Sequence, residues 1–267
     1  MKNKIKVMSF NLRVEAGFDG INHLDNRKVK ILEVIKNEAP DLIGFQEARD
    51  GTRAWLRDTL TDYTVIGCGR NADYRGESVP LAFRKDKFEM IGMDTFWLSS
   101  TPNVPESRYA GSDQSECARI ATAVVLKPMD SQSLLLFVNT HTDHQGAFSR
   151  ILASAQLLEY MSRSALPCVL TGDFNAEPCS TEMKMLIASD KFPLTDATSK
   201  IKSTYHAFGK ILTEQSIEGK VGGKPVKIDY VFTNLPTDAN ESYAVEDNHE
   251  DGIYISDHQP VVAFVEI

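Results

Sequence analysis

The chain has 267 residues, of which 42% are hydrophobic and 25% are charged, a composition typical of a water-soluble folded protein. Its formal net charge is −8 at pH 7, and an acidic surface repels phosphate backbones, which disfavours nonspecific binding of nucleic acid over a broad face. A locally basic cleft remains compatible with this composition.

The first predicted strand, IKVMSFNL at residues 5–12, has the alternation expected of a strand buried on both sides. A helix follows, running to about Glu38 and ended by Pro40. Its buried face is predicted to consist of Leu24, Ile31, Leu32 and Ile35. Short apolar runs separated by turn residues then predict strands at 41–47, 63–69, 79–84 and 88–98.

Two long apolar runs, at 119–127 and 134–141, flank the loop PMDSQS and predict a hairpin. The apolar residues then recur at helical spacing, which predicts a helix from about Gly146 to Ser164. The apolar face of this helix is predicted to consist of Phe148, Ile151, Leu152, Ala155 and Leu158. The remaining elements are predicted as a strand at 166–173, a helix at 181–189 and strands at 226–232 and 260–267.

Strands outnumber helices in this prediction, and many neighbouring strands are expected to be connected as hairpins. A purely parallel sheet would need a helix between each pair of strands. We therefore expect an α/β (α+β) sandwich with mixed sheets. No repeat, low-complexity tract or linker divides the chain, so residues 1–267 are expected to form one domain.

The cysteines and the chain start indicate the compartment. Cys68, Cys117, Cys168 and Cys179 form no CxxC pair and no zinc spacing, and we expect buried free thiols, as in a reducing cytosol. The start, MKNKIKVMSF, lacks the apolar core of a signal peptide, and no apolar run approaches the ~18 residues of a membrane span. We therefore expect a cytoplasmic protein without membrane association, and no protein partner is evident.

Polar residues gather at the ends of several predicted strands. Those at carboxyl ends are Asn11, then Gln46 with Glu47, then His141 with Asp143 and His144, then Asp173 with Asn175. Asp257 and His258 directly precede the last strand, at its amino end. Because opposite ends of antiparallel strands share an edge of a sheet, these clusters are predicted to converge on one cleft.

Each of these residues also has an ordinary explanation. A lone Asp or Asn after a strand usually forms a turn, and a lone His is usually a partly buried, hydrogen-bonded residue. Asp229 differs, because a carboxylate inside an apolar strand costs several kcal/mol unless it is paired. It therefore requires a histidine or another cation as partner. The joint occurrence of all the clusters favours a functional site.

The residue types suit a hard metal ion and an oriented imidazole. Glu47, Asn11 and Asp257 offer oxygen ligands of the kind that Mg²⁺ or Mn²⁺ prefers. His258 with Asp229 forms a pair in which the carboxylate raises the basicity of the imidazole.

Three further residues complete the predicted chemistry. Asp173 is a second candidate base, Asn175 can hold a phosphate oxygen or orient water, and His141 can donate to another phosphate oxygen. Together with a metal ion they suit in-line attack of water on phosphorus. The chain has no G-x-S-x-G nucleophile motif, no P-loop and no dinucleotide fingerprint.

The motifs SFNLR, DLIGFQE, VNTHTDH, TGDFNAEP, KIDYVF and SDHQPV occur in the order typical of the endonuclease/exonuclease/phosphatase superfamily, which the chain resembles from Ser9 to Val262. This superfamily includes pancreatic-type deoxyribonuclease, exonuclease III-like repair enzymes, neutral sphingomyelinases, inositol polyphosphate 5-phosphatases and nocturnin-type deadenylases. Residues 95–122 look like a bacterial branch of uncharacterised metal-dependent hydrolases that is similar to the deadenylase-like group.

The resemblance implies a four-layer, deoxyribonuclease-like sandwich, in which two packed mixed sheets carry helices on their outer faces. It also implies roles by motif position: a principal Mg²⁺ ligand and its neighbour (Glu47, Asn11), a residue binding metal or its waters (Asp257), a water-activating residue (Asp173), phosphate contacts (Asn175, His141) and an Asp–His pair (Asp229, His258). Whether Asp173 or His258 removes the proton from water stays open.

Several basic residues are candidates for contacting the substrate. Arg84 and Arg119 match arginines of this branch, with structural salt bridges as the alternative, while Arg108 and His144 are weaker candidates. Arg150 is expected to form a structural ion pair. The branch often carries Trp where this chain has Leu24 and another near Tyr109, a difference that would reshape the mouth of the site. The polar, Gly-rich segment 209–225 is predicted to be a mobile loop bordering the cleft.

The leading hypothesis is a Mg²⁺-dependent hydrolase of a phosphate ester. The net charge favours a phosphorylated small molecule or a nucleotide over duplex DNA. A basic groove built from Arg70, Arg75, Arg84, Arg108 and Arg119 would reverse that preference. The alternatives are a nuclease for RNA or single-stranded ends, then a lipid phosphodiesterase, and last a catalytically inactive binding module.

Overall fold

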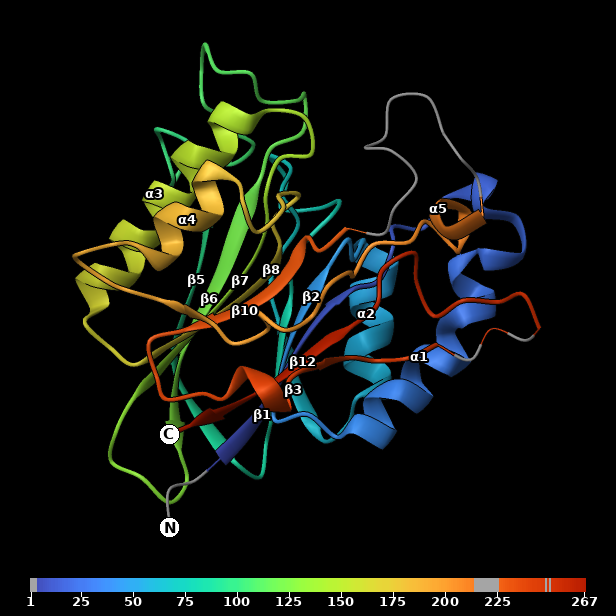
Figure 1. Ribbon diagram of the computed structural model, residues 1–267, viewed down its shortest axis with the longest axis horizontal. Helices are drawn as coiled ribbons and strands as arrows, with labels where there is room; N and C mark the ends of the chain where they lie inside the picture. Colours follow the sequence, from blue (N-terminus) through green and yellow to red (C-terminus); the bar gives the residue numbers. More distant parts are fainter. Residues whose placement is uncertain (1–3, 214–225, 248, 250) are drawn as a thin grey trace.

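The computed structural model describes residues 4–213, 226–247, 249 and 251–267, whose strands form two mixed sheets (Figure 1). The first sheet has the order β11 (Tyr243–Ala244), β12 (Val261–Glu266), β1 (Lys4–Asn11), β2 (Leu42–Gln46), β4 (Leu81–Arg84), β3 (Tyr63–Ile66). The second has the order β5 (Phe88–Trp97), β6 (Ile120–Pro128), β7 (Leu135–His141), β8 (Cys168–Asp173), β10 (Asp229–Thr233), β9 (Thr195–Asp196). Within these sheets β1 pairs with β2 and β7 with β8 in parallel, and the other pairs are antiparallel.

Helices cover the outer face of each sheet, so the expected four-layer sandwich is confirmed (Figure 1). Helices α1 (Leu24–Glu38) and α2 (Asp50–Thr59) pack on the first sheet, and α3 (Ala147–Ser164) and α4 (Thr181–Ile187) pack on the second. The alternation along β1 explains the layering, because Val7 joins the core between the sheets whereas Met8 packs with Ile31 of α1 on the outer side. Short helical turns lie at η1 (Gly17–Asn22), α5 (Lys210–Thr213) and η2 (Ala239–Glu241).

Every predicted strand is present with bounds within three residues of those expected, and the hairpin of β6 and β7 is confirmed. The two-residue strands β9 and β11 were not predicted, and neither was α2. The buried face of α2 is formed by Thr52, Arg53 and Leu56. Because two of these three residues are polar, α2 shows no apolar periodicity in the sequence.

The predicted apolar face of α3 is wrong, although its range is nearly correct. Phe148 is 53% exposed, and Ala155 is also exposed. The buried face instead consists of Ser149, Ala153, Ser154, Leu157 and Met161. Because small and polar residues share the buried face with Leu157 and Met161, the apolar pattern alone does not identify the face that contacts the second sheet. Helix α4 ends two residues earlier than predicted, at Ile187.

Helix α1 has the expected range, and Leu24, Ile31 and Ile35 are buried, whereas Leu32 is half-buried. Its buried face also contains Arg27, which an apolar pattern cannot reveal.

The four cysteines are free thiols, but the prediction that they are buried holds only for Cys168, and Cys179 is exposed. Arg150 forms the expected structural ion pair, with 2.7 Å between its Nε and Oε1 of Glu182. None of the helices in the described ranges has both the length and the apolar character needed to cross a membrane. Most of the segment predicted as a mobile loop, 214–225, lies outside the described residues.

Candidate active site

The polar residues at the strand ends meet at one end of the two sheets. Asn11 and Gln46 are paired last residues of the parallel strands β1 and β2. In the second sheet, His141 pairs with Asp173 at the ends of β7 and β8, and Asp229 at the start of β10 also pairs with Asp173. The convergence expected from strand direction is therefore present in the structure.

Asn11 connects the two sheets at the centre of this cluster. Its Nδ2 donates to Oε1 of Glu47 at 3.1 Å and to Oδ2 of Asp173 at 2.9 Å. Its Oδ1 accepts from the backbone N–H of Arg13, which fixes the orientation of the amide. Glu47 also accepts from the backbone N–H of Val14 at 2.6 Å, and its φ of 62° is uncommon for a residue with a Cβ. Such strain is frequent at functional sites.

Asp229 has the partner that its burial requires. Its Oδ2 lies 2.8 Å from Nδ1 of His258, and both residues are buried. Burial lowers the pKa of His258, but Asp229, Asp173 and Asp257 raise it by more, so the pKa lies well above its usual value. The imidazole Nε2 faces the cluster, 3.7 Å from Oδ2 of Asp173 and 4.0 Å from Oδ1 of Asp257.

The carboxylates of the cluster are crowded and buried. Burial raises the pKa of Asp173, and Asp229 raises it further, against the opposing effect of the two histidines His141 and His258. Burial likewise raises the pKa of Asp257. A cation among these groups would favour their ionised forms.

On the other side of Asp173 lies a pair that the sequence analysis missed. Nδ1 of His141 is 3.6 Å from Oε1 of Glu77, which also accepts from Nη1 of Arg70 at 2.7 Å. Burial raises the pKa of Glu77, but His141 and Arg70 lower it more, to about 2, so the carboxylate is ionised at neutral pH. The other imidazole nitrogen of His141 lies 3.0 Å from Nδ2 of Asn175. Glu77 was missed because it lies in the turn-rich connection between β3 and β4, away from any strand end.

The predicted residues Arg119 and His144 lie beside this pair. Arg119 is buried, and its Nη2 is 2.8 Å from Nδ1 of His144. Its Nη1 is 4.0 Å from Oε1 of Glu77, and its Nε is 3.5 Å from Oδ2 of Asp143. Arg119 therefore makes the structural contacts that were the alternative to a substrate contact, although it lies next to the cluster.

Arg108 is exposed and lies further out on the same side. Its Nη1 donates to the carbonyl oxygen of Ser115, whose hydroxyl contacts Asp143.

The structure does not bring Arg84 to the cluster. Arg84 ends β4, which runs antiparallel to β2, and its N–H bonds to the carbonyl of Asp41 at the far end of the sheet. Its side chain forms two hydrogen bonds to Asp86, at 2.9 and 2.7 Å. The structure thus places Arg84 away from the predicted cleft, so it takes no part in a five-arginine groove there.

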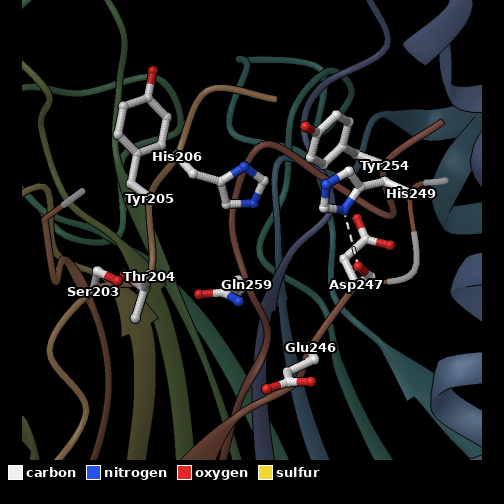
Figure 2. A pocket seen from close by; sticks show the side chains of 9 residues that line it. All are labelled: Ser203, Thr204, Tyr205, His206, Glu246, Asp247, His249, Tyr254 and Gln259. Carbon is white, nitrogen blue, oxygen red and sulfur yellow. Dashed lines mark hydrogen bonds between the residues drawn. The ribbon is translucent and has the colours of Figure 1, made fainter. Parts of the chain in front are cut away.

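A pocket of ≈ 300 Å³ flanks the Asp229–His258 pair, and Figure 2 shows its lining. His249 and Tyr254 stack at 4.2 Å on one side, with His206 pointing toward them. The ring of Tyr205, another lining residue, lies 4.8 Å from that of His258. The carboxylates that line this pocket belong to Glu246 and Asp247, so it is a poor site for a phosphate group.

The donor set of the central cluster fits a divalent cation. Ligand atoms of Glu47, His141 and Asp173 lie within 4.8 Å of one another, as do those of Asp173, Asp229 and His258. Within the described residues, the buried Oδ1 of Asp229 has no hydrogen-bond partner. The carboxylate oxygens of this set suit Mg²⁺ or Mn²⁺.

Comparison with known proteins identifies related chains. The profile of the Endonuclease/Exonuclease/phosphatase family matches residues 8–258. An endonuclease/exonuclease/phosphatase from Bacteroides vulgatus is 28% identical with a TM-score of 0.87, and the match covers 100% of both chains.

Two further solved structures extend the comparison. A mannosyl-6-phosphatase from Bacteroides thetaiotaomicron is 26% identical, with a TM-score of 0.79, and the match covers 98% of this chain and 99% of that one. The catalytic domain of human nocturnin with a bound sulfate anion shares the fold at 20% identity, with a TM-score of 0.71 and coverage of 100% and 96%.

Proposed function

Because the chain belongs to the endonuclease/exonuclease/phosphatase family, whose members hydrolyse phosphate esters, we propose that it is a Mg²⁺-dependent hydrolase of a phosphate ester, with Mn²⁺ as a substitute ion. The proposal rests on the groups that surround Oδ2 of Asp173. This oxygen lies 2.9 Å from Nδ2 of Asn11, 3.5 Å from Nε2 of His141 and 3.7 Å from Nε2 of His258. Groups from both sheets thus face one buried carboxylate.

Glu47 would hold the metal ion, with Asn11 beside it and Asp257 binding the ion or its waters. When bound, the ion supplies positive charge to the oxygens of the phosphate. The carboxylate of Glu47 is already oriented by Val14 and Asn11, so little reorganisation is needed to accept an ion.

Asp173 and His258 share the proton chemistry. Asp229 accepts from Nδ1 of His258, which leaves Nε2 facing Asp173. Because the pKa of His258 is raised well above its usual value, the imidazolium form favours His258 as a donor to a phosphate oxygen. Asp173 is then the group that orients the attacking water and accepts its proton.

His141 and Asn175 would hold the phosphate on the opposite side. The contacts of His141 with Glu77 and Asn175 orient its ring. Nδ2 of Asn175 is the donor in its contact with Nε2 of His141, so a phosphate oxygen would replace this contact, and donors oriented in advance stabilise the negative charge of the transition state at little entropic cost.

A small phosphorylated molecule, such as a sugar phosphate, is the substrate class we favour. The mannosyl-6-phosphatase is 26% identical over nearly the whole chain, and the net charge of −8 disfavours long polyanions.

The test is a substrate panel with Mg²⁺, Mn²⁺ or EDTA. It comprises mannose 6-phosphate, p-nitrophenyl phosphate, bis-p-nitrophenyl phosphate, a 3′-labelled RNA oligomer and supercoiled plasmid. We expect EDTA-sensitive turnover of a monoester that Asp173→Asn abolishes and that the exposed control Asp190→Asn retains. Turnover of RNA alone would support the nuclease alternative, and turnover unaffected by EDTA or by Asp173→Asn would contradict the proposal.

A further inference from the structure

Arg27 is a buried cation in the first turns of α1 that the proposed chemistry does not use. Its side chain is 0% exposed. Nε donates to the carbonyl of Asn22 at 2.7 Å, Nη1 donates to the carbonyls of Leu12 and Ile255 at 2.7 Å each, and Nη2 donates to that of Arg13 at 3.2 Å. One guanidinium therefore joins both ends of the connection between β1 and α1 to the segment before β12.

The joined segments lie next to Asn11, whose amide nitrogen contacts the proposed ligand Glu47, and next to Asp257. Leu12 directly follows Asn11, and Ile255 lies two residues before Asp257. The hydroxyl of Ser256 also donates to the carbonyl of Asn11 at 2.7 Å, so the same two segments are joined a second time next to the ligands. Asn22 lies near the other end of the connection between β1 and α1, so the contact of Arg27 with its carbonyl closes that loop.

A neutral side chain could fill this position at lower electrostatic cost. Burial lowers the pKa of Arg27 to about 10, against the effect of Asp257 and Asp19, which raise it. The side chain remains charged at neutral pH. The guanidinium donates its hydrogen bonds to backbone carbonyls. Only the planar side chain of arginine, with its five donors, can bind all of these carbonyls at once.

We propose that Arg27 is a positioning residue that holds the segments of Asn11 and Asp257 at the separation needed to bind the divalent cation. This inference rests on the proposed function, because the ion belongs to that site. Loss of the fork would let the two segments move apart, while the core between the two sheets and the core beneath α1 and α2 keep the sandwich formed. Outer contacts of this kind typically change metal affinity by about 10- to 100-fold.

The test measures Mn²⁺ binding to the full-length chain without substrate, from the electron paramagnetic resonance signal of the free ion. Arg27→Met removes the charge and the donors at similar length, and Arg27→Lys keeps the charge but not the fork. The control is Ile31→Ala, which truncates a buried residue of the same helix and is expected to lower the melting temperature. Thermal unfolding is measured for every variant.

We expect Arg27→Met to weaken Mn²⁺ binding by about 10-fold or more, Arg27→Lys to weaken it less, and Ile31→Ala to leave it unchanged despite a lower melting temperature. Wild-type affinity in both Arg27 variants would overturn the inference, as would a loss in Ile31→Ala that matches its loss of stability. If Arg27→Met fails to fold, the Mn²⁺ affinity of Arg27→Lys is compared with that of Ile31→Ala, and weaker binding in Arg27→Lys alone supports the inference.

Glu47→Gln separates this inference from the proposed function. Wild-type protein that binds no Mn²⁺, or Glu47→Gln that binds as well as wild type, would overturn the metal site itself and the role of Arg27 with it. Binding that depends on Glu47 but not on Arg27 would overturn the role of Arg27 alone.

Discussion

Asn11 donates from Nδ2 to Oδ2 of Asp173 across 2.9 Å, and this contact joins the end of β1 in the first sheet to the end of β8 in the second. The same amide group also donates to Glu47 at 3.1 Å. A neutral donor thus lies between two carboxylates where the two sheets meet. The charge balance of the site depends on it.

Replacement of this amide by a carboxylate should make folding depend on a divalent ion. Asn11→Asp would place three carboxylates within contact distance, so we expect a lower melting temperature than wild type in EDTA and partial recovery with Mg²⁺. The exposed control Asn37→Asp should change stability by no more than about 1 kcal/mol, with no response to Mg²⁺. A Mg²⁺ response equal to that of wild type would contradict the placement of the ion beside Asn11.

The pH dependence should change when Asp229 is neutralised. Burial lowers the pKa of His258, but Asp229 contributes the largest opposing effect, so the pKa should fall in Asp229→Asn. His258 would then lose its proton at lower pH than in wild type. We expect the alkaline limb of the kcat/KM profile to move to lower pH, with a lower maximum rate. An unmoved limb would show that another group sets it.

The same pair should make stability pH-dependent in the metal-free protein. The folded-state pKa of His258 is raised above the unfolded-state pKa of about 6.5. The stability contributed by the charged imidazole is therefore fully present below about pH 6.5 and is lost as the pH rises through the folded-state pKa. Urea unfolding of wild type and Asp229→Asn should therefore differ more at pH 6 than at high pH. An equal difference at both would contradict this linkage.

Glu77→Gln should impair turnover without unfolding the protein. The change removes the carboxylate beside Nδ1 of His141 and the counter-charge that contacts Arg70 at 2.7 Å. We expect kcat/KM to fall by about 10-fold or more, or about 1.4 kcal/mol of transition-state stabilisation. The comparison is Glu33→Gln, the same substitution at an exposed position of α1. If both variants keep wild-type rates, the orienting role of Glu77 is excluded.

Arg84→Gln should leave kinetics unchanged, because Arg84 lies at the far end of the sheet and pairs with Asp86. Such an exposed pair is worth about 1 kcal/mol of stability at most. Arg119→Gln, beside Glu77 and His144, should lower kcat/KM measurably. A loss of activity in Arg84→Gln equal to that in Arg119→Gln would restore the original prediction for Arg84.

Residues whose position follows from a strand end could be predicted from the sequence. Asn11, His141 and Asp173 end strands whose apolar runs are long, and Asp229 required a partner because it is a carboxylate in an apolar run. Strand direction then placed these side chains at one edge. Arg84 was instead assigned from the resemblance to a branch of the superfamily, and the antiparallel pairing of β4 with β2 places it at the far end of the sheet.

Residues positioned by loops or by buried polar faces could not be predicted in this way. Glu77 lies in a connection without periodicity, and Arg27 is a charged residue on the buried face of α1. Helix α2 was missed for the same reason, because Thr52 and Arg53 occupy its buried face. Such residues are identified only when the contacts around them are known.

The central claim is that a divalent ion lies between the ends of the two sheets, beside Glu47 and Asp173. Anomalous diffraction from crystals grown with Mn²⁺ and inorganic phosphate tests it most directly. We predict a manganese peak at Glu47, with the phosphate between it and His141 and His258. A peak at the acidic pocket of Glu246 and Asp247, or no peak in crystals of active protein, would contradict the account.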